Sequence, residues 1–245
     1  MKSKNSFVLK FFIFTVITAI ILLCLMYFFP SKNKSDDVPT TADPQTKYTT
    51  VIIDAGHGGE DGGTQAPFGT LEKDLNLKIA ELIKKELEEM GIPVIMTRTE
   101  DKLLYDTSVN YKGQKKKLDA AARLKIVEDN PNSIFVSIHM NSYVDPQYSG
   151  LQVWYSQNNP SSEPIARLIQ ERNNTLFQVG NKRQTKPTGN NIYIMSKIQC
   201  PAVLIECGFL SNPREAANLC DSGYQIALSK SLASSIAEYI KNAQG

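Results

Sequence analysis

The sequence feature that most constrains the fold is an apolar run that breaks into a glycine-rich turn carrying a histidine. Residues Val51, Ile52 and Ile53 are β-branched and predict a buried strand, which residues 54–59 follow with the sequence DAGHGG. Glycine adopts backbone conformations that are strained for other residues, so these glycines predict a tight turn. His57 is therefore expected just beyond the carboxyl end of a strand, which is where ligands bind in open α/β sheets.

The other of the chain's two histidines ends a second apolar run. Residues 134–139 have the sequence IFVSIH, so His139 also lies at the end of a predicted strand. Two histidines at equivalent strand ends, in a chain that has no others, are expected to meet in one site.

The remaining chain alternates strand and helix patterns, which predicts a single α/β domain over residues 49–245. We expect a twisted, mostly parallel or mixed sheet of about six strands with helices on both faces. The apolar patterns predict strands near residues 51–53, 92–98, 134–139, 150–155, 191–195 and 201–206. They predict helices near residues 75–90, 118–127, 164–177, 215–219 and 224–240. Three consecutive lysines, 115–117, are interpreted as a solvated helix face.

The amino-terminal residues predict a membrane anchor. Residues 11–29 carry no charged side chain, and about 20 such residues can cross a bilayer as a helix. Lys2, Lys4 and Lys10 precede them, so the positive-inside rule predicts that the bulk of the chain is exported. We expect a signal anchor over residues 1–30, a polar tether over 31–48, and a single-pass protein of the cell membrane whose folded domain is extracytoplasmic. The alternative is a cleaved signal peptide and a secreted domain.

The charge and the cysteines exclude two classes of protein. The formal net charge of +2 argues against a dedicated nucleic-acid binder, which would show a strong basic stripe. Three cysteines lie in the predicted domain, at Cys200, Cys207 and Cys220, and an odd number this small does not make a disulfide scaffold. A disulfide between Cys200 and Cys220 and three buried thiols are both compatible with the sequence.

The two histidines, together with a carboxylate, predict a catalytic zinc site. Two imidazoles and a carboxylate, with a fourth position open to water, form a common catalytic zinc shell. The third ligand is not decided by spacing, because several acidic residues lie near His57. Glu72 is favoured because it lies at the start of a helix that can direct it back at the strand ends, and Asp54 could instead orient a histidine. The other acidic residues near His57 are Glu60, Asp61 and Asp74.

Glu206 is a candidate for proton transfer. It ends the apolar run of residues 201–206, and an ionised carboxylate at the end of a buried strand needs either a partner or a function. A zinc hydrolase also needs a carboxylate that does not bind the metal, to take the proton of the attacking water and deliver it to the leaving nitrogen.

Four sequence blocks resemble the zinc-dependent N-acetylmuramoyl-L-alanine amidases in order and spacing. They are residues 54–59 (DAGHGG), 72–77 (EKDLNL), 137–142 (SIHMNS) and 205–212 (IECGFLSN), and the resemblance covers about residues 49–242. It implies hydrolysis of the amide between N-acetylmuramic acid and the L-alanine of the peptidoglycan peptide stem. It also implies that His57, Glu72 and His139 bind Zn²⁺, that Glu206 is the catalytic acid and base, and that Asn141 lines the substrate cleft.

A membrane-anchored catalytic domain without wall-binding repeats is similar to the amidases of endospore formers that help to make muramic-δ-lactam in the spore cortex. That resemblance implies a deacetylase that acts after the amidase and, in some members, a lipoprotein activator. The connections between elements are too short for the inhibitory helical insertion of amidases that separate cells, so control by a separate protein or by expression is a hypothesis. Two alternative functions remain: a zinc peptidase that acts within the stem peptide, and a catalytically silent wall-binding module.

Overall fold

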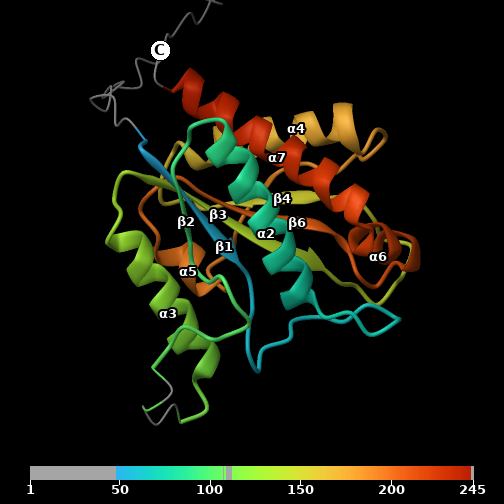
Figure 1. Ribbon diagram of the computed structural model, residues 1–245, viewed down its shortest axis with the longest axis horizontal. Helices are drawn as coiled ribbons and strands as arrows, with labels where there is room; N and C mark the ends of the chain where they lie inside the picture. The colour runs from blue at the N-terminus through green and yellow to red at the C-terminus, as the bar shows by residue number, and fades with distance from the viewer. Residues whose placement is uncertain (1–47, 107, 109–111, 244–245) are drawn as a thin grey trace, which may run out of the picture. The chain divides into compact units, whose positions relative to one another are not determined.

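The computed structural model describes residues 48–106, 108 and 112–243, which form one α/β domain (Figure 1). Its six-stranded sheet has the order β2-β1-β3-β6-β4-β5. The strands are β1 (Thr50–Ala55), β2 (Val94–Met96), β3 (Ser133–Asn141), β4 (Gln152–Tyr155), β5 (Lys186–Pro187) and β6 (Ala202–Phe209). The helices are α2 (Glu72–Glu89), α3 (Lys115–Glu128), α4 (Ser162–Arg172), α5 (Tyr193–Lys197), α6 (Pro213–Cys220) and α7 (Ser222–Asn242), and the π-helical turn η1 (Asn173–Phe177) follows α4.

The sheet is mixed, with a parallel centre. Strands β2, β1, β3 and β6 are parallel neighbours, whereas β4 is antiparallel to β6 and β5 is parallel to β4. Because parallel strands end at the same edge, β1, β3 and β6 bring their carboxyl ends together. The predicted fold class, one α/β domain with a mixed sheet and helices on both faces, is confirmed for the described residues.

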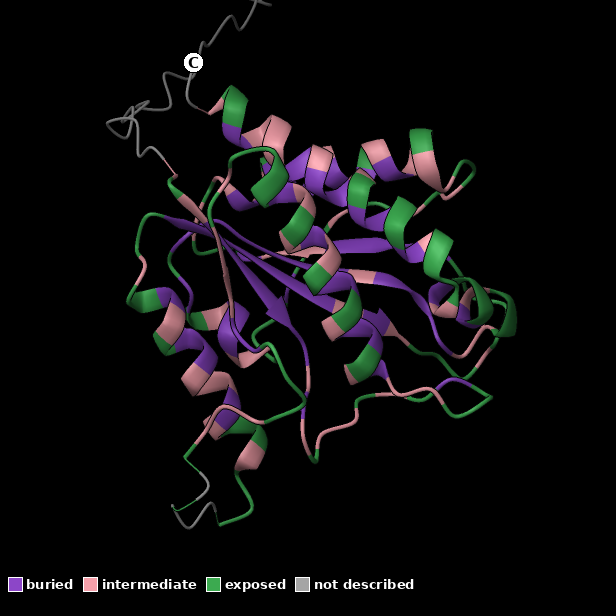
Figure 2. Ribbon diagram, in the orientation of Figure 1, coloured by how far each residue is buried: buried purple, intermediate pink, exposed green. Residues whose placement is uncertain are grey.

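Helices cover both faces of the sheet, and the central strands β1, β3 and β6 are buried along almost their whole length (Figure 2). Ile53, Val136 and Ile205 pack in the core with the buried faces of α2, α4 and α7. Phe135 and Leu204 belong to the second core, which includes residues of α3 and α5. Strands buried on both faces explain the continuous apolar runs that the sequence shows.

The strand predicted at residues 191–195 is wrong. These residues lead into and form most of the short helix α5, where Ile194, Met195 and Ile198 are buried against the second core. Burial of two adjacent residues and of a third one turn later is a helical pattern, and it overrides the strand propensity of Ile192 and Tyr193. The edge strand is instead β5, whose lysine and proline carry no apolar signal.

Three smaller expectations also need correction. The helix predicted near residues 75–90 ends at Glu89, and Met90 lies beyond its last turn with an exposed side chain. The helix predicted to reach Phe177 ends at Arg172 and continues as the π-helical turn. Helix α3 begins at Lys115, so the lysine run forms its first turn.

The three cysteines of the described residues are free thiols, and no disulfide joins Cys200 to Cys220. Cys200 is buried in the core of the α3 and α5 face, whereas Cys220 packs against the core of the other face. The sheet lies between these two cores, which rules out a bond between the two sulfurs.

Within the described ranges, no helix has the length and apolar character needed to cross a bilayer. The predicted anchor over residues 1–30 and most of the predicted tether over 31–48 lie outside the described residues.

Candidate metal centre and active site

Four side chains singled out in the sequence lie at the common carboxyl edge of β1, β3 and β6. His57 follows β1 by two residues, and His139 lies near the end of β3. Glu206 is the direct neighbour of His139 in the register of β3 and β6. Glu72 is the first residue of α2, and its side chain is buried. The edge therefore holds the two histidines, which were expected to meet, and two carboxylates.

His57, Glu72 and His139 form a compact group of possible metal ligands. Glu72 Oε1 lies 3.1 Å from His57 Nε2 and 3.0 Å from His139 Nδ1. The two imidazole rings have their centroids 4.9 Å apart at an interplanar angle of 76°. One donor atom from each of the three residues lies within 4.8 Å of the others, so a single ion could contact all three.

The electrostatics of this group keep Glu72 ionised. Burial by itself would raise its pKa, but hydrogen bonds and charge interactions with His139 and His57 bring the pKa well below its usual range. The same carboxylate accepts hydrogen bonds from the backbone N–H of Thr64 at 2.8 Å and of Met140 at 3.0 Å. An ionised, oriented carboxylate between two imidazoles is the form that a metal ligand requires.

Asp61 is the residue that orients His57. Its Oδ2 lies 2.9 Å from Nδ1 of His57, on the opposite side of the ring from the nitrogen that faces Glu72. Burial lowers the pKa of His57, but the interactions with Glu72 and Asp61 outweigh burial and leave the pKa raised. Asp61 also pairs with Lys116, whose side chain is exposed, as expected for a solvated helix face.

Asp54, the other candidate for orienting a histidine, has a different role. Its carboxylate accepts hydrogen bonds from Thr97 Oγ1 at 2.8 Å, Ser137 Oγ at 2.6 Å and the guanidinium of Arg123. No hydrogen bond between Asp54 and a histidine occurs in the described part of the chain. Asp54 therefore supports the base of the turn that carries His57.

The structure distinguishes among the acidic residues that the sequence left as candidates for the third metal ligand. Glu60 pairs with Lys115, and Asp74 is exposed on the first turn of α2. Only Glu72 belongs to the ligand group. Asn141 is half-buried, and its side-chain oxygen accepts a hydrogen bond from the backbone N–H of Ser142 at 2.8 Å. Its predicted place in a substrate cleft stays a prediction.

Two buried arginines hold the backbone of the glycine-rich turn. Arg98 donates to the carbonyl oxygens of Ala55 at 2.9 Å and Gly56 at 3.1 Å. Arg123 donates to those of Ala55 at 2.8 Å and His57 at 2.7 Å. His57 has a φ of 59°, a left-handed conformation that costs energy for a residue with a side chain. These four bonds fix the turn in that conformation, and sequence reasoning did not identify either arginine.

Close packing around the ligand group requires glycine at two positions, Gly56 and Gly63. A Cβ atom added at Gly56 would lie 2.2 Å from Nε2 of His139, and one at Gly63 would lie 2.5 Å from Oε2 of Glu72. Real Cβ atoms do not come this close to other heavy atoms, so any side chain at either position would displace a residue of the ligand group.

We expect Gly56→Ala to weaken metal binding and to lower the free energy of unfolding by about 1–3 kcal/mol, the usual cost of overpacking. The added methyl group forces the imidazole of His139 or the turn itself to move. Titration with zinc and thermal unfolding measure the two effects. Gly189→Ala is the matched control, because its added Cβ would meet nothing within 4 Å. Equal metal affinity of the Gly56→Ala protein and the wild type would contradict this reading.

We expect Asp61→Asn to lower metal affinity about 10–100-fold while the fold is retained, since groups that orient a ligand histidine typically contribute this much. Competition with a chelator of known affinity measures the change. Glu60→Gln provides a control, because this neighbouring carboxylate pairs with Lys115 and is not in the ligand group. An unchanged affinity would show that Asp61 does not position His57.

Glu206 lies beside the ligand group without belonging to it. Burial raises the pKa of its carboxyl to about 7, although the charge interaction with His139 opposes the increase. Its Oε2 atom is buried and has no hydrogen-bond partner among the described residues. A carboxyl group with this pKa can both accept and donate a proton near neutral pH.

The donor set fits one class of metal. Two imidazole nitrogens and one carboxylate oxygen are the three protein ligands of many catalytic zinc sites, which leave a position for water or substrate. Structural zinc sites have four protein ligands and usually include cysteine, but Cys207 is buried and lies outside this group.

Comparisons with known proteins agree with this geometry. A model of the N-acetylmuramoyl-L-alanine amidase family matches residues 51–238. The germination-specific N-acetylmuramoyl-L-alanine amidase of Bacillus subtilis is 33% identical over 189 residues, which cover 77% of this chain and 78% of that protein. The CwlD amidase of Clostridioides difficile, solved in complex with the GerS lipoprotein, is 34% identical with a TM-score of 0.74, over 79% of this chain and 99% of that one. The catalytic domain of CwlV from Bacillus (Paenibacillus) polymyxa is 27% identical with a TM-score of 0.67, over 79% and 98%.

Proposed function

The chain belongs to the N-acetylmuramoyl-L-alanine amidase family, and from this premise we propose that it is a zinc enzyme of the spore cortex. Its reaction is the hydrolysis of the amide bond between N-acetylmuramic acid and L-alanine in peptidoglycan. The observation that carries the proposal is the group of His57, Glu72 and His139 beside a glutamate with an unpaired oxygen.

His57, Glu72 and His139 are the proposed zinc ligands. Zinc bound by these residues would act as a Lewis acid, which would polarise the scissile carbonyl group and make water a better nucleophile near neutral pH. Glu72 contributes the negative charge, and Asp61 fixes the ring of His57 through Nδ1. The arginines behind the turn hold its carbonyl groups, so the ligands are oriented before any substrate arrives.

Glu206 is the proposed acid and base. Its unpaired Oε2 takes the proton of the attacking water and then delivers it to the nitrogen of L-alanine as the amide bond breaks. The buried position of Glu206, which brings its pKa to about 7, makes both transfers possible at one pH. The products are a free lactyl carboxyl group on the sugar and a peptide that begins with L-alanine.

We expect His139→Ala to lose both zinc and hydrolysis. The test compares the purified wild type and the variant for zinc content and for cleavage of purified peptidoglycan, with mass analysis of the products. About one zinc per wild-type chain and release of L-alanyl peptides would support the proposal. New amino termini within the stem would instead indicate a peptidase. Binding of peptidoglycan without cleavage, in the presence of excess zinc, would indicate a wall-binding module.

The proposed setting is the maturation of the spore cortex, where the amidase acts before a deacetylase to form muramic-δ-lactam. Two similarities support this setting, one to a germination-specific amidase and one to an amidase solved with a lipoprotein. We therefore include a lipoprotein activator among the proposed partners. Deletion of the gene should give a cortex without muramic-δ-lactam, whereas a normal cortex would assign the enzyme to the vegetative wall.

We also propose that residues 1–30 anchor the enzyme in the cell membrane, with the catalytic domain outside the cytoplasm. The support is the uncharged stretch of residues 11–29 and the lysines that precede it. Fractionation of cells that express the full chain tests the anchor. Recovery of a shortened chain in the culture medium would show that the segment is cleaved.

A further inference from the structure

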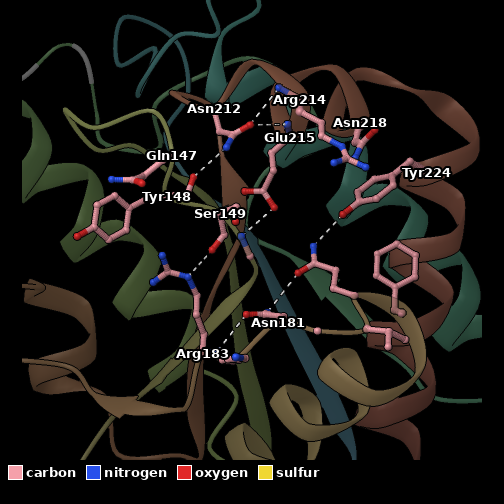
Figure 3. A pocket seen from close by; sticks show the side chains of 16 residues that line it. Gln147, Tyr148, Ser149, Asn181, Arg183, Asn212, Arg214, Glu215, Asn218 and Tyr224 are labelled. Carbon is pink, nitrogen blue, oxygen red and sulfur yellow. Dashed lines mark hydrogen bonds between the residues drawn. The ribbon is translucent and has the colours of Figure 1, made fainter.

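A cavity of about 1060 Å³ is lined by sixteen residues, none of which is a proposed zinc ligand (Figure 3). Its walls come from the loop between β3 and β4, the loop after η1, and helices α6 and α7. The first of these loops begins three residues after His139, at the end of β3. The ring centroid of its Tyr148 lies 6.2 Å from that of Phe209 at the end of β6. The cavity therefore continues the edge at which β3 and β6 end.

A row of side chains leads from the metal ligands to this cavity. His139 is paired in register with Glu206, and Glu206 is paired with Gln152 on β4. Side chains at directly paired positions lie on the same face of a sheet, so these three form a row across three strands. At its end, Oε1 of Gln152 accepts a hydrogen bond from Nη1 of Arg183 at 3.0 Å. Arg183 is thus one side chain away from the proposed catalytic glutamate.

Arg183 is held in place but keeps unused donors. Its guanidinium carbon lies 4.5 Å from the ring centroid of Phe209, and its Nε donates to the carbonyl oxygen of Ser149 at 2.6 Å. Arginine has five N–H donors, and these contacts with Ser149 and Gln152 use two of them. Among the described residues, no carboxylate forms an ion pair with Arg183. The guanidinium is therefore a fixed cation with free donors at the wall of the cavity.

The cavity has an excess of positive charge. Three cations line it, Lys182, Arg183 and Arg214, against one acidic residue, Glu215. The carboxylate of Glu215 is engaged by the protein itself, because it accepts backbone N–H groups from Gly150 and Phe209, each at 2.8 Å. Figure 3 shows Arg183 and Arg214 on different sides of the cavity. An anionic group is the complement of such a wall, and a planar guanidinium with free donors favours a carboxylate.

We propose that Arg183 binds a carboxylate of the substrate's peptide stem and so selects acidic stems for cleavage. This inference rests on the proposed amidase function, in which the peptide leaves as Glu206 protonates the nitrogen of L-alanine. In this scheme the bound peptide extends from Glu206 past Gln152, across the ends of β6 and β4, towards Arg183 and the cavity. Arg183 is a specificity residue in this scheme, and it takes no part in the proton transfers.

The test uses synthetic N-acetylmuramoyl peptides that differ only in whether their carboxylates are free or converted to amides. The wild type should cleave the free-carboxylate peptides with a kcat/KM about 10–100-fold higher than that of the amides, the range expected for one charge-assisted hydrogen-bonding site. Arg183→Gln should remove this preference, through a higher KM for the free-carboxylate peptides and little change in kcat. Arg183→Lys should restore part of it.

Arg172→Gln is the matched control, because this arginine pairs with Glu238 between α4 and α7. If Arg183→Gln lowered kcat/KM equally for both kinds of peptide, the proposal would be overturned. Arg183 would then serve to pack against Phe209 or to contact the sugar. A wild type without preference would overturn it as well. Failure of the amidase function is distinguishable, because the Kd of the same peptides for the Glu206→Gln protein, with and without Arg183→Gln, reports carboxylate binding without cleavage.

Discussion

Replacing Glu206 by glutamine is expected to lower the rate of peptidoglycan hydrolysis about 10²–10⁴-fold while zinc content stays the same. Glutamine keeps the size and polarity of the side chain but cannot take a proton from water. Glu206 is outside the ligand group, so the three donors of His57, Glu72 and His139 are unaffected. Mass-spectrometric rates of L-alanyl peptide release, measured beside metal analysis of the same preparation, separate the two effects.

The fold should tolerate this substitution. The Oε2 atom of Glu206 has no hydrogen-bond partner among the described residues, so an amide group at this position breaks no internal bond. Removing a carboxyl group that burial disfavours in its charged form also relieves a desolvation cost. Glu171→Gln, on the exposed surface of α4, controls for the loss of one acidic group. Hydrolysis by Glu206→Gln at the wild-type rate would rule out Glu206 as the acid and base.

The parts of the site that were predictable from the sequence depend on local patterns. The runs that form β1, β3 and β6 are apolar enough to identify the strands. His139 and Glu206 directly follow the apolar residues of β3 and β6, and His57 follows β1 by two residues. Because parallel strands share an edge, strand ends alone bring His57, His139 and Glu206 together. Glu72 could be chosen only as one of several acidic residues, since its position depends on the direction of α2.

The parts that were not predictable depend on contacts between distant residues. Arg123 lies 69 positions from Asp54 and 66 from His57, and nothing in the local sequence of α3 distinguishes it from a surface arginine. Arg98 ends the strand predicted near residues 92–98, and its hydrogen bonds go only to backbone carbonyl groups, which leave no trace in the sequence. The role of Arg183 is equally hard to predict, because its partners Ser149 and Gln152 are distant in the sequence. Each of these arginines is defined by tertiary packing.

The same reasoning applies to the misassigned segment. Ile192, Tyr193 and Ile194 favour a strand by composition, and the packing of Ile194 and Met195 against the sheet turns the segment into α5. A two-residue edge strand such as β5 has too few residues to show a pattern at all.

The second large effect that we expect is the destabilisation of Arg123→Met by about 3–5 kcal/mol, the usual result of removing one partner of a buried ion pair. Arg123 and Asp54 are 4% and 2% exposed. Arg123 also bonds Oδ2 of Asp119 at 2.8 Å and holds the carbonyl groups of Ala55 and His57. For a domain of 150–250 residues this loss corresponds to a decrease in Tm of about 6–20 °C. Arg167→Met, which removes an exposed arginine of α4, should change Tm little.

The pH dependence of the Tm difference tests the cause. Burial tends to raise the pKa of Asp54, but Arg123 and Ser137 bring it below its ordinary value. Such a group stabilises the fold above its unfolded pKa of about 3.9, and this stability is lost as the pH falls through the folded pKa.

In the Arg123→Met protein, burial favours the protonated form of Asp54, so a lower pH should stabilise the folded variant. The difference in Tm should therefore narrow from pH 7 towards pH 4, and Asp54→Asn in the Arg123→Met background should recover part of the loss at pH 7. A difference that is constant with pH would show that packing of the arginine side chain, and not its charge, stabilises the turn that carries His57.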